Sequence, residues 1–573
     1  MLLGMLSILF VWTALAFAFV GLGLQLLRAL GDVLAGADRL ICAFWAGWAG
    51  VILFLQLWHC FAPVGPATLA VVLVAGLVTL LVNRQAIRFL KFRTPFEVSF
   101  LVTACAFGVW LANHAMGPMD CYDAGLYHLS SIRWITSYRI VPGLGNLHGR
   151  LAYNSAYFPY LALTQAGPWQ ASARHLGNGL LLLVLALMIE LSIWRLWTAR
   201  ANVRSSAVLL TMLMVPVARR CFMELVSTSP DLPVFVIGAL VSVYLWCTLF
   251  AEEPYDRLHS HAFMTMMLSA IGVTIKLSFL AFGATASILA LLRLVLVRRS
   301  QTRSHPGKPL FILILLPLLA VAIWMARGVV LSGYLAYPVH YASFNVPWRV
   351  PLSNTILDRR WIESWARLPQ LHPDEVLGKW TWFAPWVKRM WQTYPFDVVA
   401  PLLAAVVGLV LWLALRGRKD TDLLRGAGLL APCLASLSFW FLTSPDPRFL
   451  GAASWALAAG ALALAARTHL GRWGLAAARA VVVATVLATA GTHWTHEKII
   501  DPGPRNGFYP IPTAEVRPFV ADSGLTLFVP VSGDQCWDAP LPCTPYPHRG
   551  LSLRDKQSPA RGFIMTEEPA GRR

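Results

Sequence analysis

The sequence contains few charged residues for its length. Asp, Glu, Lys and Arg make up 13% of its 573 residues, whereas hydrophobic residues make up 57%. A water-soluble chain of this length divides into several domains with far more charged surface. The composition therefore excludes an ordinary soluble enzyme and predicts an integral membrane protein.

Acidic residues are the scarcer of the two charged classes. The chain has 28 Asp and Glu against 47 Lys and Arg, a formal net charge of +19. The basic residues form short clusters between apolar runs, as at 84–93, 298–308 and 416–420. Short cytoplasmic loops carry such an excess of Lys and Arg, whereas a nucleic-acid-binding protein needs a basic soluble face. We therefore expect no nucleic-acid partner.

Glycine motifs for nucleotides are missing, and cysteines are few. Neither a P-loop nor a G-x-G-x-x-G pattern occurs, so ATP-driven transport and dinucleotide chemistry have no support. Seven of the nine cysteines stand alone in or near apolar segments. The other two, Cys536 and Cys543 in "CWDAPLPC", predict a disulfide if the polar tail faces an oxidising compartment. Neither C-x-x-C spacing nor clustered histidines indicate a metal site there.

Long apolar runs predict an all-α polytopic membrane protein with about fourteen spans, because about 20 apolar residues cross the hydrocarbon core. The first run lacks a basic leader and a clear cleavage site, so we expect it to be retained as a span. The expected spans lie near 5–27, 40–61, 66–83, 97–115, 175–197, 205–222, 231–250, 262–280, 281–297, 309–329, 397–415, 426–443, 449–466 and 474–491.

The alternation of these spans agrees with the positions of the basic clusters. If 84–93 is cytoplasmic, the basic loops 195–204, 298–308, 416–425 and 467–473 fall on the same side. Loops 116–174, 330–396 and 444–448 and the tail 492–573 then lie outside. We expect three regions: N-terminal transmembrane helices (1–96), a membrane core (97–492) with outer loops 116–174 and 330–396, and an outer strand-and-loop cap (493–573).

The two long outer loops have different patterns. In "AGLYHLSSIRWITSYR", Leu126, Leu129, Ile132 and Ile135 recur near one helical face, which predicts a helix along the membrane surface. Loop 330–396 contains seven tryptophans, the residue typical of segments at the headgroup level.

The outer stretch "MDCYDAGLYHLSSIRWI" (119–135) concentrates proton-handling side chains. Asp120 and Asp123 are three residues apart and share a face of a helix or turn. A carboxylate at the edge of a low-dielectric region has a raised pKa, which suits a general base. Tyr127 and His128 follow one turn later, placed to orient a carboxylate or a substrate hydroxyl. Asp123, Asp120 and His128 are thus candidate catalytic residues; the alternative is that an aspartate caps the helix.

The pattern Y-D-x-x-x-Y-H in "YDAGLYH" resembles the first-loop acidic motif of the GT-C glycosyltransferases, multi-span enzymes that take sugars from polyprenyl-phosphate carriers. The resemblance implies that Asp123 deprotonates or orients the acceptor, with Tyr127 and His128 as the trailing aromatic and histidine. Two features differ from that family. Ala124 replaces the acidic residue that often follows, and four spans precede the motif instead of one.

A second resemblance covers nearly the whole chain. The stretches "IVPGLGNLHGRLAYNSAYF", "STSPDLP", "LSGYLAYP", "SPDPRFL" and "GDQCWDAPLPCTPYP" are similar to a group of functionally uncharacterised bacterial membrane proteins. This similarity implies a multi-pass protein of the bacterial inner membrane with its active face in the periplasm.

Three basic residues are candidates for holding a lipid-linked phosphate. Arg448 follows Asp446 in "SPDPRFL" and either binds phosphate or closes the turn as an Asp–Arg pair. Arg327, near the outer end of a span, binds phosphate or extends to the headgroups. Lys276 contacts the donor phosphate or pairs with Asp231 or Glu224, because a lone ammonium in a span is costly.

Further polar and aromatic residues of the outer loops suit a hydroxyl-rich ligand. The candidate substrate-binding set is Tyr127, Arg133, His148, Arg150, Tyr153, Asn154, Lys276, Arg327, Tyr337, Asp446 and Arg448. Asp120 and Asp123 could also bind a divalent cation, but two carboxylates alone do not make a dedicated metal site, and no cofactor is assigned.

The leading hypothesis is transfer of a sugar from a polyprenyl-phosphate donor to an outer glycan, glycolipid or protein acceptor, within a membrane of ordinary lipids. A transporter or flippase for a lipid-linked glycan is the alternative, and it predicts ionisable residues deep in several spans and similar halves. A non-catalytic envelope scaffold is a third hypothesis, and it leaves the polar first loop unexplained.

Overall fold

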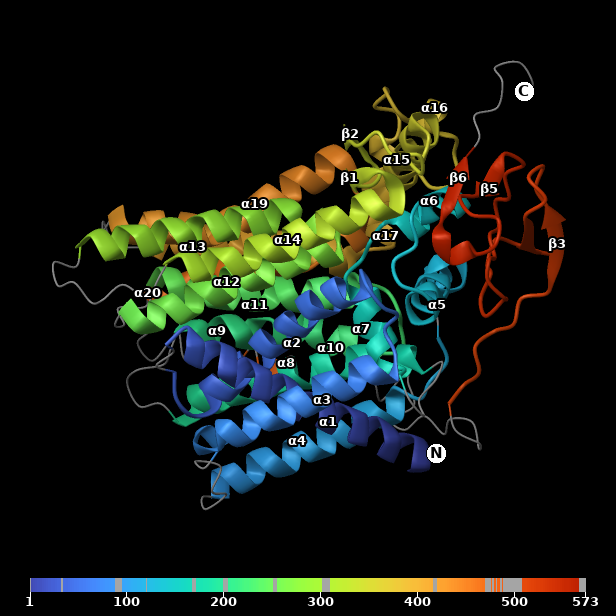
Figure 1. Cartoon of the computed structure of the whole chain (residues 1–573). Helices are drawn as coiled ribbons and strands as arrows, with labels where there is room; N and C mark the ends of the chain where they lie inside the picture. Colours follow the sequence, from blue (N-terminus) through green and yellow to red (C-terminus); the bar gives the residue numbers. More distant parts are fainter. Residues whose placement is uncertain are drawn as a thin grey trace.

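Long helices running side by side dominate the computed structural model of the chain (Figure 1). Loops and short elements gather at one end of this bundle, where α5, α6, α15 and the C-terminal strands lie. The structure describes residues 2–31, 34–87, 95–119, 121–166, 172–198, 205–250, 255–300, 310–415, 420–468 and 508–565, with isolated positions between 476 and 487.

The bundle confirms the predicted helical membrane protein. Its long helices are α1 (Leu2–Ala29), α2 (Gly36–His59), α3 (Pro66–Val82), α4 (Pro95–His114), α8 (Ala173–Thr198), α11 (Asp231–Phe250), α12 (Tyr255–Ile275), α13 (Leu280–Ser300), α14 (Leu310–Ser332), α18 (Ala400–Leu415), α19 (Asp420–Thr443) and α20 (Ala453–Thr468). Within the described ranges, nine helices are long and apolar enough to cross a membrane, and two shorter helices are also apolar. The number of fourteen spans stays a prediction, and span 474–491 falls mostly outside the described residues.

Two expected spans differ in detail from the observed helices. Span 205–222 is divided into α9 (Ser205–Met212) and α10 (Met214–Met223). Pro216 has no amide hydrogen to continue the helical ladder, which accounts for the break. α12 ends at Ile275, five residues before the expected boundary, so Lys276 lies in an extended connection rather than inside a span.

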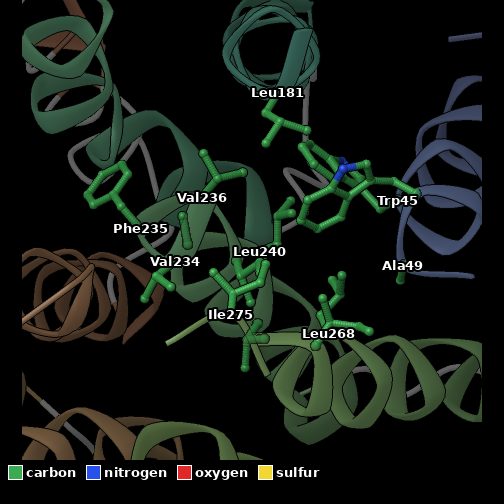
Figure 2. Packing of buried hydrophobic residues seen from close by; sticks show 14 of the residues in the cluster. Trp45, Ala49, Leu181, Val234, Phe235, Val236, Leu240, Leu268 and Ile275 are labelled. Atoms are coloured by element: carbon green, nitrogen blue, oxygen red, sulfur yellow. The ribbon is translucent and has the colours of Figure 1, made fainter. Parts of the chain in front are cut away.

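Side-chain packing places α11 and α12 in the middle of the bundle. In Figure 2, Leu240 of α11 lies toward Trp45 of α2 and Leu268 of α12, whereas Val234 and Phe235 lie on the other side of α11; all five are buried. In both α11 and α12, 94% of the apolar window is buried, against 28% for the windows of α13 and α18. The central pair is therefore enclosed by protein, whereas α13 and α18 expose apolar side chains on the outside of the bundle.

Glycines allow the N-terminal helices to approach closely. A Cβ on Gly23 of α1 would overlap the carbonyl oxygen of Ala43 in α2, and a Cβ on Gly47 would overlap that of Phe19. Small residues at facing positions permit such backbone contact between membrane helices.

The first outer loop contains short helical segments: η2 (Ala124–His128), α5 (Leu129–Ser137), α6 (Leu144–Leu147), η3 (Gly149–Ala152) and α7 (Tyr157–Thr164). The predicted surface helix is present as η2 and α5. Its apolar residues, including Leu126 and Ile132, are buried against the rest of the protein, so this face does not lie on the membrane as expected.

The second outer loop is built from β1 (Tyr334–Ala336), β2 (Val339–Ser343), α15 (Leu352–Arg367), α16 (Pro373–Val376) and α17 (Phe383–Gln392). β1 and β2 pair antiparallel. Its tryptophans do not all occupy one environment: Trp382 and Trp386 are buried beside Trp440 of α19, whereas Trp380 and Trp391 are exposed.

The C-terminal cap consists of short antiparallel pairs, β3 (Val516–Val520) with β4 (Thr526–Pro530) and β5 (Leu551–Leu553) with β6 (Phe563–Met565). These strands lie beside α5 and α6 at the outer end of the bundle (Figure 1). A disulfide joins Cys536 and Cys543.

Candidate functional site

Asp123 stands at the start of η2 and contacts two arginines. Arg150, from η3 in the same loop, places Nη1 3.2 Å from Asp123 Oδ1. Arg448, from the turn η7 (Pro447–Phe449) between α19 and α20, donates from Nη1 to Asp123 Oδ2 at 3.1 Å. The two residues are 325 positions apart in the sequence. The fold thus brings together two of the candidate motifs, "YDAGLYH" and "SPDPRFL".

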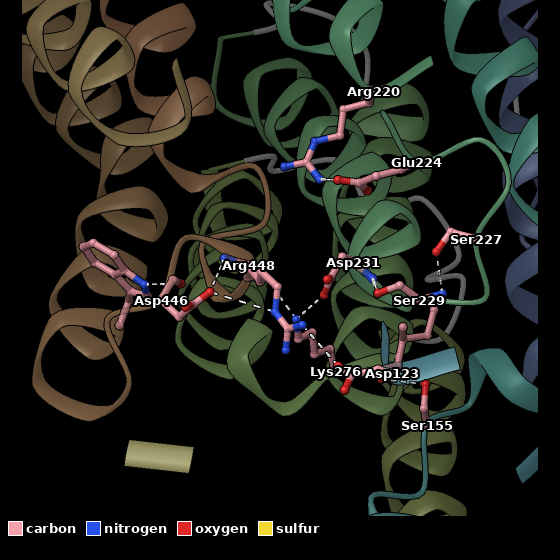
Figure 3. Close-up of polar contacts among 12 residues, drawn as sticks. Asp123, Ser155, Arg220, Glu224, Ser227, Ser229, Asp231, Lys276, Asp446 and Arg448 are labelled. Atoms are coloured by element: carbon pink, nitrogen blue, oxygen red, sulfur yellow. Dashed lines mark hydrogen bonds and ion pairs between the residues drawn. The ribbon is translucent and has the colours of Figure 1, made fainter. Parts of the chain in front are cut away.

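Lys276 joins the same group of charges. It follows α12 and forms an ion pair with Asp231, the first residue of α11, while its Nζ donates to the backbone oxygen of Arg448 at 2.9 Å. Its carboxylate partner is therefore Asp231 and not Glu224, which pairs with Arg220. Figure 3 shows Asp123, Asp231, Lys276 and Arg448 pointing toward one another from separate elements.

The turn that carries Arg448 is held in place by hydrogen bonds. Asp446 Oδ1 accepts from the backbone amide of Arg448 at 3.0 Å, and the guanidinium Nε lies 3.9 Å from the same oxygen. Indole groups of Trp386 and Trp440 donate to the backbone oxygens of Pro445 and Asp446, each at 2.7 Å. Asp446 therefore closes the turn, and the Arg448 guanidinium remains free to reach Asp123.

The charges in this cluster balance one another. Partial burial disfavours the charged form of Arg448, but the carboxylates of Asp231, Asp123 and Asp446 outweigh burial and raise its pKa above the ordinary value. The Arg448 side chain is 56% exposed, whereas that of Asp123 is 14% exposed. The site therefore presents an accessible guanidinium in front of a largely enclosed carboxylate.

His128 lies behind Tyr127, with ring centroids 4.4 Å apart. Its Nδ1 is 3.0 Å from Thr228 Oγ1, and among the described residues its buried Nε2 has no hydrogen-bond partner. Burial lowers the pKa of His128 to about 4, so the imidazole is neutral at pH 7. The same motif that supplies Asp123 thus also supplies an uncharged histidine inside the protein.

Aromatic residues form a wall beside Arg150. The ring of Tyr153 lies 5.7 Å from that of Tyr127 and 6.3 Å from that of Tyr337. The Tyr337 hydroxyl donates to Asp358 of α15. All three tyrosines were expected to bind substrate, and the structure brings them together near Asp123.

Asp358 is a residue that sequence reasoning missed. Its carboxylate packs so closely on Gly149 that a Cβ there would overlap it, and Gly149 precedes Arg150. Burial raises the pKa of Asp358 above its ordinary value, opposed by the Tyr337 hydrogen bond and by Arg150. In the sequence, "LDRRWIESW" reads as an ordinary charged helix, so only the proximity of Gly149 in space distinguishes this aspartate.

Several other candidates have different neighbours from those expected. Arg327, which was expected either to bind phosphate or to extend to the headgroups, is buried away from Asp123: its Nη1 is 2.9 Å from His59 Nδ1, and its Nε donates to Asn154 Oδ1 at 3.2 Å. The loop turns Asn154 inward onto α14, which the sequence could not reveal.

Arg133 and His148 face the cap. Arg133 pairs with Asp538 at 3.1 Å and also donates to the backbone oxygen of Ala539. The His148 ring lies 5.5 Å from the Tyr546 ring, and burial together with Arg150 lowers the His148 pKa to about 3. Asp120 lies outside the described residues.

The disulfide-bearing part of the cap covers the segment around Asp123. The Trp537 amide donates to the Gly125 carbonyl at 3.0 Å, and a Cβ on Gly125 would lie 2.6 Å from the Trp537 ring. Gln535 Nε2 donates to the Tyr122 carbonyl at 2.7 Å, and the Tyr122 hydroxyl donates to Asp534. The cap therefore fixes the residues on both sides of Asp123.

Metal binding and known relatives give little further information. In the described part of the chain, which omits Asp120, no group of three or more His, Cys, Asp or Glu side chains could hold a metal ion.

A family model described as a domain of unknown function, DUF8201, matches residues 5–455, and the chain belongs to this family. No curated protein and no solved structure matches it.

Proposed function

We propose that the protein is a membrane glycosyltransferase that moves a sugar from a polyprenyl-phosphate donor to an outer acceptor, which is a glycan, a glycolipid or a protein. One observation supports this most: the carboxylate of the first-loop motif contacts Arg448, contributed by a turn 325 residues away. Such a transfer needs a carboxylate that accepts the acceptor proton and a guanidinium that binds the phosphate, and here the two meet at the ends of membrane helices.

The donor phosphate would bind the exposed Arg448 guanidinium, because a planar guanidinium suits paired hydrogen bonds to phosphate oxygens. Lys276 adds a second positive charge beside it, since its Nζ contacts the Arg448 backbone. When Arg448 turns to the phosphate, Asp123 Oδ2 loses its arginine partner and becomes available to an acceptor hydroxyl.

The proposed transfer exchanges one bond to the anomeric carbon of the sugar for another. The acceptor hydroxyl oxygen bonds to the anomeric carbon of the sugar, and the bond from that carbon to the phosphate oxygen breaks. The acceptor proton goes to Asp123, and the bonding electrons leave with the phosphate, whose charge Arg448 and Lys276 neutralise. Tyr153 and Tyr337 would hold the sugar or acceptor by their ring faces. A periplasmic active face in a bacterial inner membrane is part of this proposal.

The position of the charges favours transfer over transport. A flippase would need ionisable groups deep within its spans. Asp231 is the first residue of α11, Lys276 follows the last residue of α12, and Arg448 lies in a turn, so these groups are at helix ends.

Asp123→Asn tests the proposal. Without a proton acceptor, we expect sugar transfer to fall by at least about 100-fold. The cell-surface glycan and glycolipid profile of this strain, measured by mass spectrometry, should then match that of a deletion strain.

Asp374→Asn is the matched control, because Asp374 is a 65% exposed carboxylate in the second outer loop. Immunoblotting establishes that both variants reach the wild-type amount in the membrane. A wild-type glycan profile for Asp123→Asn at a wild-type protein level would contradict the proposal.

A further inference from the structure

A second charged recess lies at the junction of the membrane helices, the first outer loop and the cap. This groove has a volume of about 450 Å³. Its lining residues are Cys60, Arg139, Ile140, Pro142, Val330, Arg554, Asp555, Ala560 and Arg561. It shares none of these residues with the cluster around Asp123, and the proposed transferase mechanism leaves it unused.

The groove is lined by three arginines and a single carboxylate. The Nε of Arg561 lies 3.9 Å from Asp555 Oδ2, so this pair is loose. Arg554 stacks on the Trp348 ring at 4.5 Å and donates to the backbone oxygen of Arg561 at 3.2 Å. Among the residues that the structure describes, Arg139 has no ion-pair or hydrogen-bond partner. The lining therefore has excess positive charge.

Arg139 also lines a smaller cavity, whose lining includes Arg327. Arg327 is 3% exposed, and its nearby acceptors are neutral: the Gln56 carbonyl at 3.2 Å, His59 Nδ1 at 2.9 Å and Asn154 Oδ1 at 3.2 Å. His59 Nε2 faces the Tyr138 carbonyl at 3.1 Å, which fixes its proton there and leaves Nδ1 as an acceptor. No carboxylate of the described residues pairs with Arg327, so its charge adds to the positive potential of the cavity that Arg139 also lines.

The groove opens where lipid headgroups can reach it. Cys60 follows the last residue of α2, and its neighbours Leu57 and Phe61 are 46% and 75% exposed. Val330 belongs to the final turn of α14, another candidate span. Apolar side chains exposed beside the ends of membrane helices lie at the edge of the hydrocarbon core, and phosphate groups occupy the layer just outside it.

We propose that this groove binds the phosphate group of an anionic ligand, with Arg139 and Arg561 as its main contacts. Arginine recognises phosphate through paired, charge-assisted hydrogen bonds. The phosphate comes either from an anionic lipid headgroup or from a free phosphate. This inference stands independently of the proposed transferase activity.

Binding to the purified full-length protein in neutral detergent tests the inference. Phosphatidylglycerol and inorganic phosphate are the two probes, and zwitterionic phosphatidylcholine is the lipid control. Retained lipid is counted by native mass spectrometry. We expect Arg139→Gln and Arg561→Gln each to weaken phosphatidylglycerol binding about five-fold, and the double variant about 25-fold. Arg517→Gln, an exposed arginine of β3 outside the groove, should change nothing.

The two probes distinguish the source of the phosphate. Arginine-dependent phosphatidylglycerol binding that inorganic phosphate does not displace supports a lipid headgroup. Displacement by inorganic phosphate supports a soluble ligand. If the double variant retains phosphatidylglycerol and binds inorganic phosphate as the wild type does, the proposal is overturned. The Arg561 side chain is 65% exposed, so Arg561→Gln should fold normally. If Arg139→Gln fails to fold, lipid binding by Arg561→Gln alone tests the proposal.

Discussion

At the scale of single residues, the site depends on how each charge is paired. Asp123 forms ion pairs with two arginines, and Arg448 forms ion pairs with two aspartates. Lys276 forms an ion pair with Asp231 and donates a hydrogen bond to the Arg448 backbone. Removing any one side chain reduces the charge compensation of its partners in a partly buried position, which is costly. A neutral substitution in this group therefore changes its neighbours as well as itself.

The buried histidine of the motif predicts a pH-dependent stability. The pKa of His128 is about 4 in the folded protein, against an ordinary 6.5. Between these pH values the unfolded chain binds a proton that the folded chain does not, so the free energy of unfolding falls as the pH falls. A difference of about 2.5 pKa units corresponds to about 3 kcal/mol for this residue.

We therefore expect His128→Gln to lose less thermal stability than the wild type when the pH falls from 7.5 to 4.5. The measurement is the midpoint of thermal unfolding of the purified protein in detergent. His372→Gln, which alters an exposed side chain of the second outer loop, should follow the wild type. An unchanged pH dependence in His128→Gln would show that His128 does not contribute.

The sequence predicted some of these residues and not others. "YDAGLYH" singled out Asp123 because a polar motif is conspicuous between apolar spans, and the cost of a lone ammonium predicted a carboxylate for Lys276. The neighbours of Arg327 could not be predicted, because the position of a residue along a span gives its depth but not the direction of its side chain. Asp358 was missed because its proximity to Arg150 exists only in the folded protein.

At the scale of elements, the disulfide-bearing loop of the cap positions the segment that carries Asp123. The loop closed by Cys536 and Cys543 contains Trp537, whose amide bonds to Gly125. A disulfide that closes a loop of this size lowers the conformational entropy of the unfolded chain and so stabilises the folded form by about 2–3 kcal/mol. The loop therefore acts as a preformed surface on which η2 rests.

Gly125→Ala tests this contact. The added methyl group would meet the Trp537 ring at 2.6 Å, so the loop must shift away from η2. We expect faster amide hydrogen exchange over residues 121–133 in the purified full-length protein. Gly65→Ala is the control, because a Cβ at Gly65 meets nothing within 4 Å. Equal exchange in both variants and the wild type would argue against a positioning role for the loop.

Element boundaries were predictable where composition changes and less so where it does not. α11 starts at the aspartate of "SPD", a turn signal, and its start was predicted at residue 231 as observed. The break between α9 and α10 was missed, although Pro216 marks it, because the surrounding residues remain apolar. The surface helix and the C-terminal cap were both predicted, but the contact between them was not, because the residues that meet are about 400 positions apart.

At the scale of the whole molecule, two helices that begin near the site carry arginines near their other ends. α13 begins just after Lys276 and carries Arg298 near its other end; α20 begins just after Arg448 and carries Arg467 near its other end. The alternation deduced from charge agrees with this separation. Charge and composition thus predicted, for these two helices, a separation that the structure has; which end faces outward stays a prediction.

A labelling experiment checks this topology in cells. Cysteine introduced at Asp522, in the cap, should react with a membrane-impermeant maleimide added from outside the inner membrane. Cysteine introduced at Asp422, a half-exposed residue at the end of α19 away from the site, should react only after the membrane is permeabilised. The unsubstituted protein gives the background of its native cysteines. The opposite pattern would place the cap and the site in the cytoplasm.

The arrangement of helices within the bundle could not be predicted from composition. α11 and α13 are similarly apolar, yet 94% of the α11 window is buried against 28% for α13. The protein interior and the lipid are equally apolar surroundings, so a helix enclosed by protein and a helix facing lipid have similarly apolar sequences.

The enclosure of α11 and α12 also has a mechanical consequence. Asp231 and Lys276 are attached to these two helices, whose apolar windows are the most buried among the described candidate spans, whereas α13 and α18 expose apolar side chains that would face a bilayer. Changes in bilayer thickness act first on lipid-facing helices, which tilt or bend to match it. The peripheral helices would absorb such deformation, so the spacing of the charged cluster should be insensitive to the thickness of the host membrane.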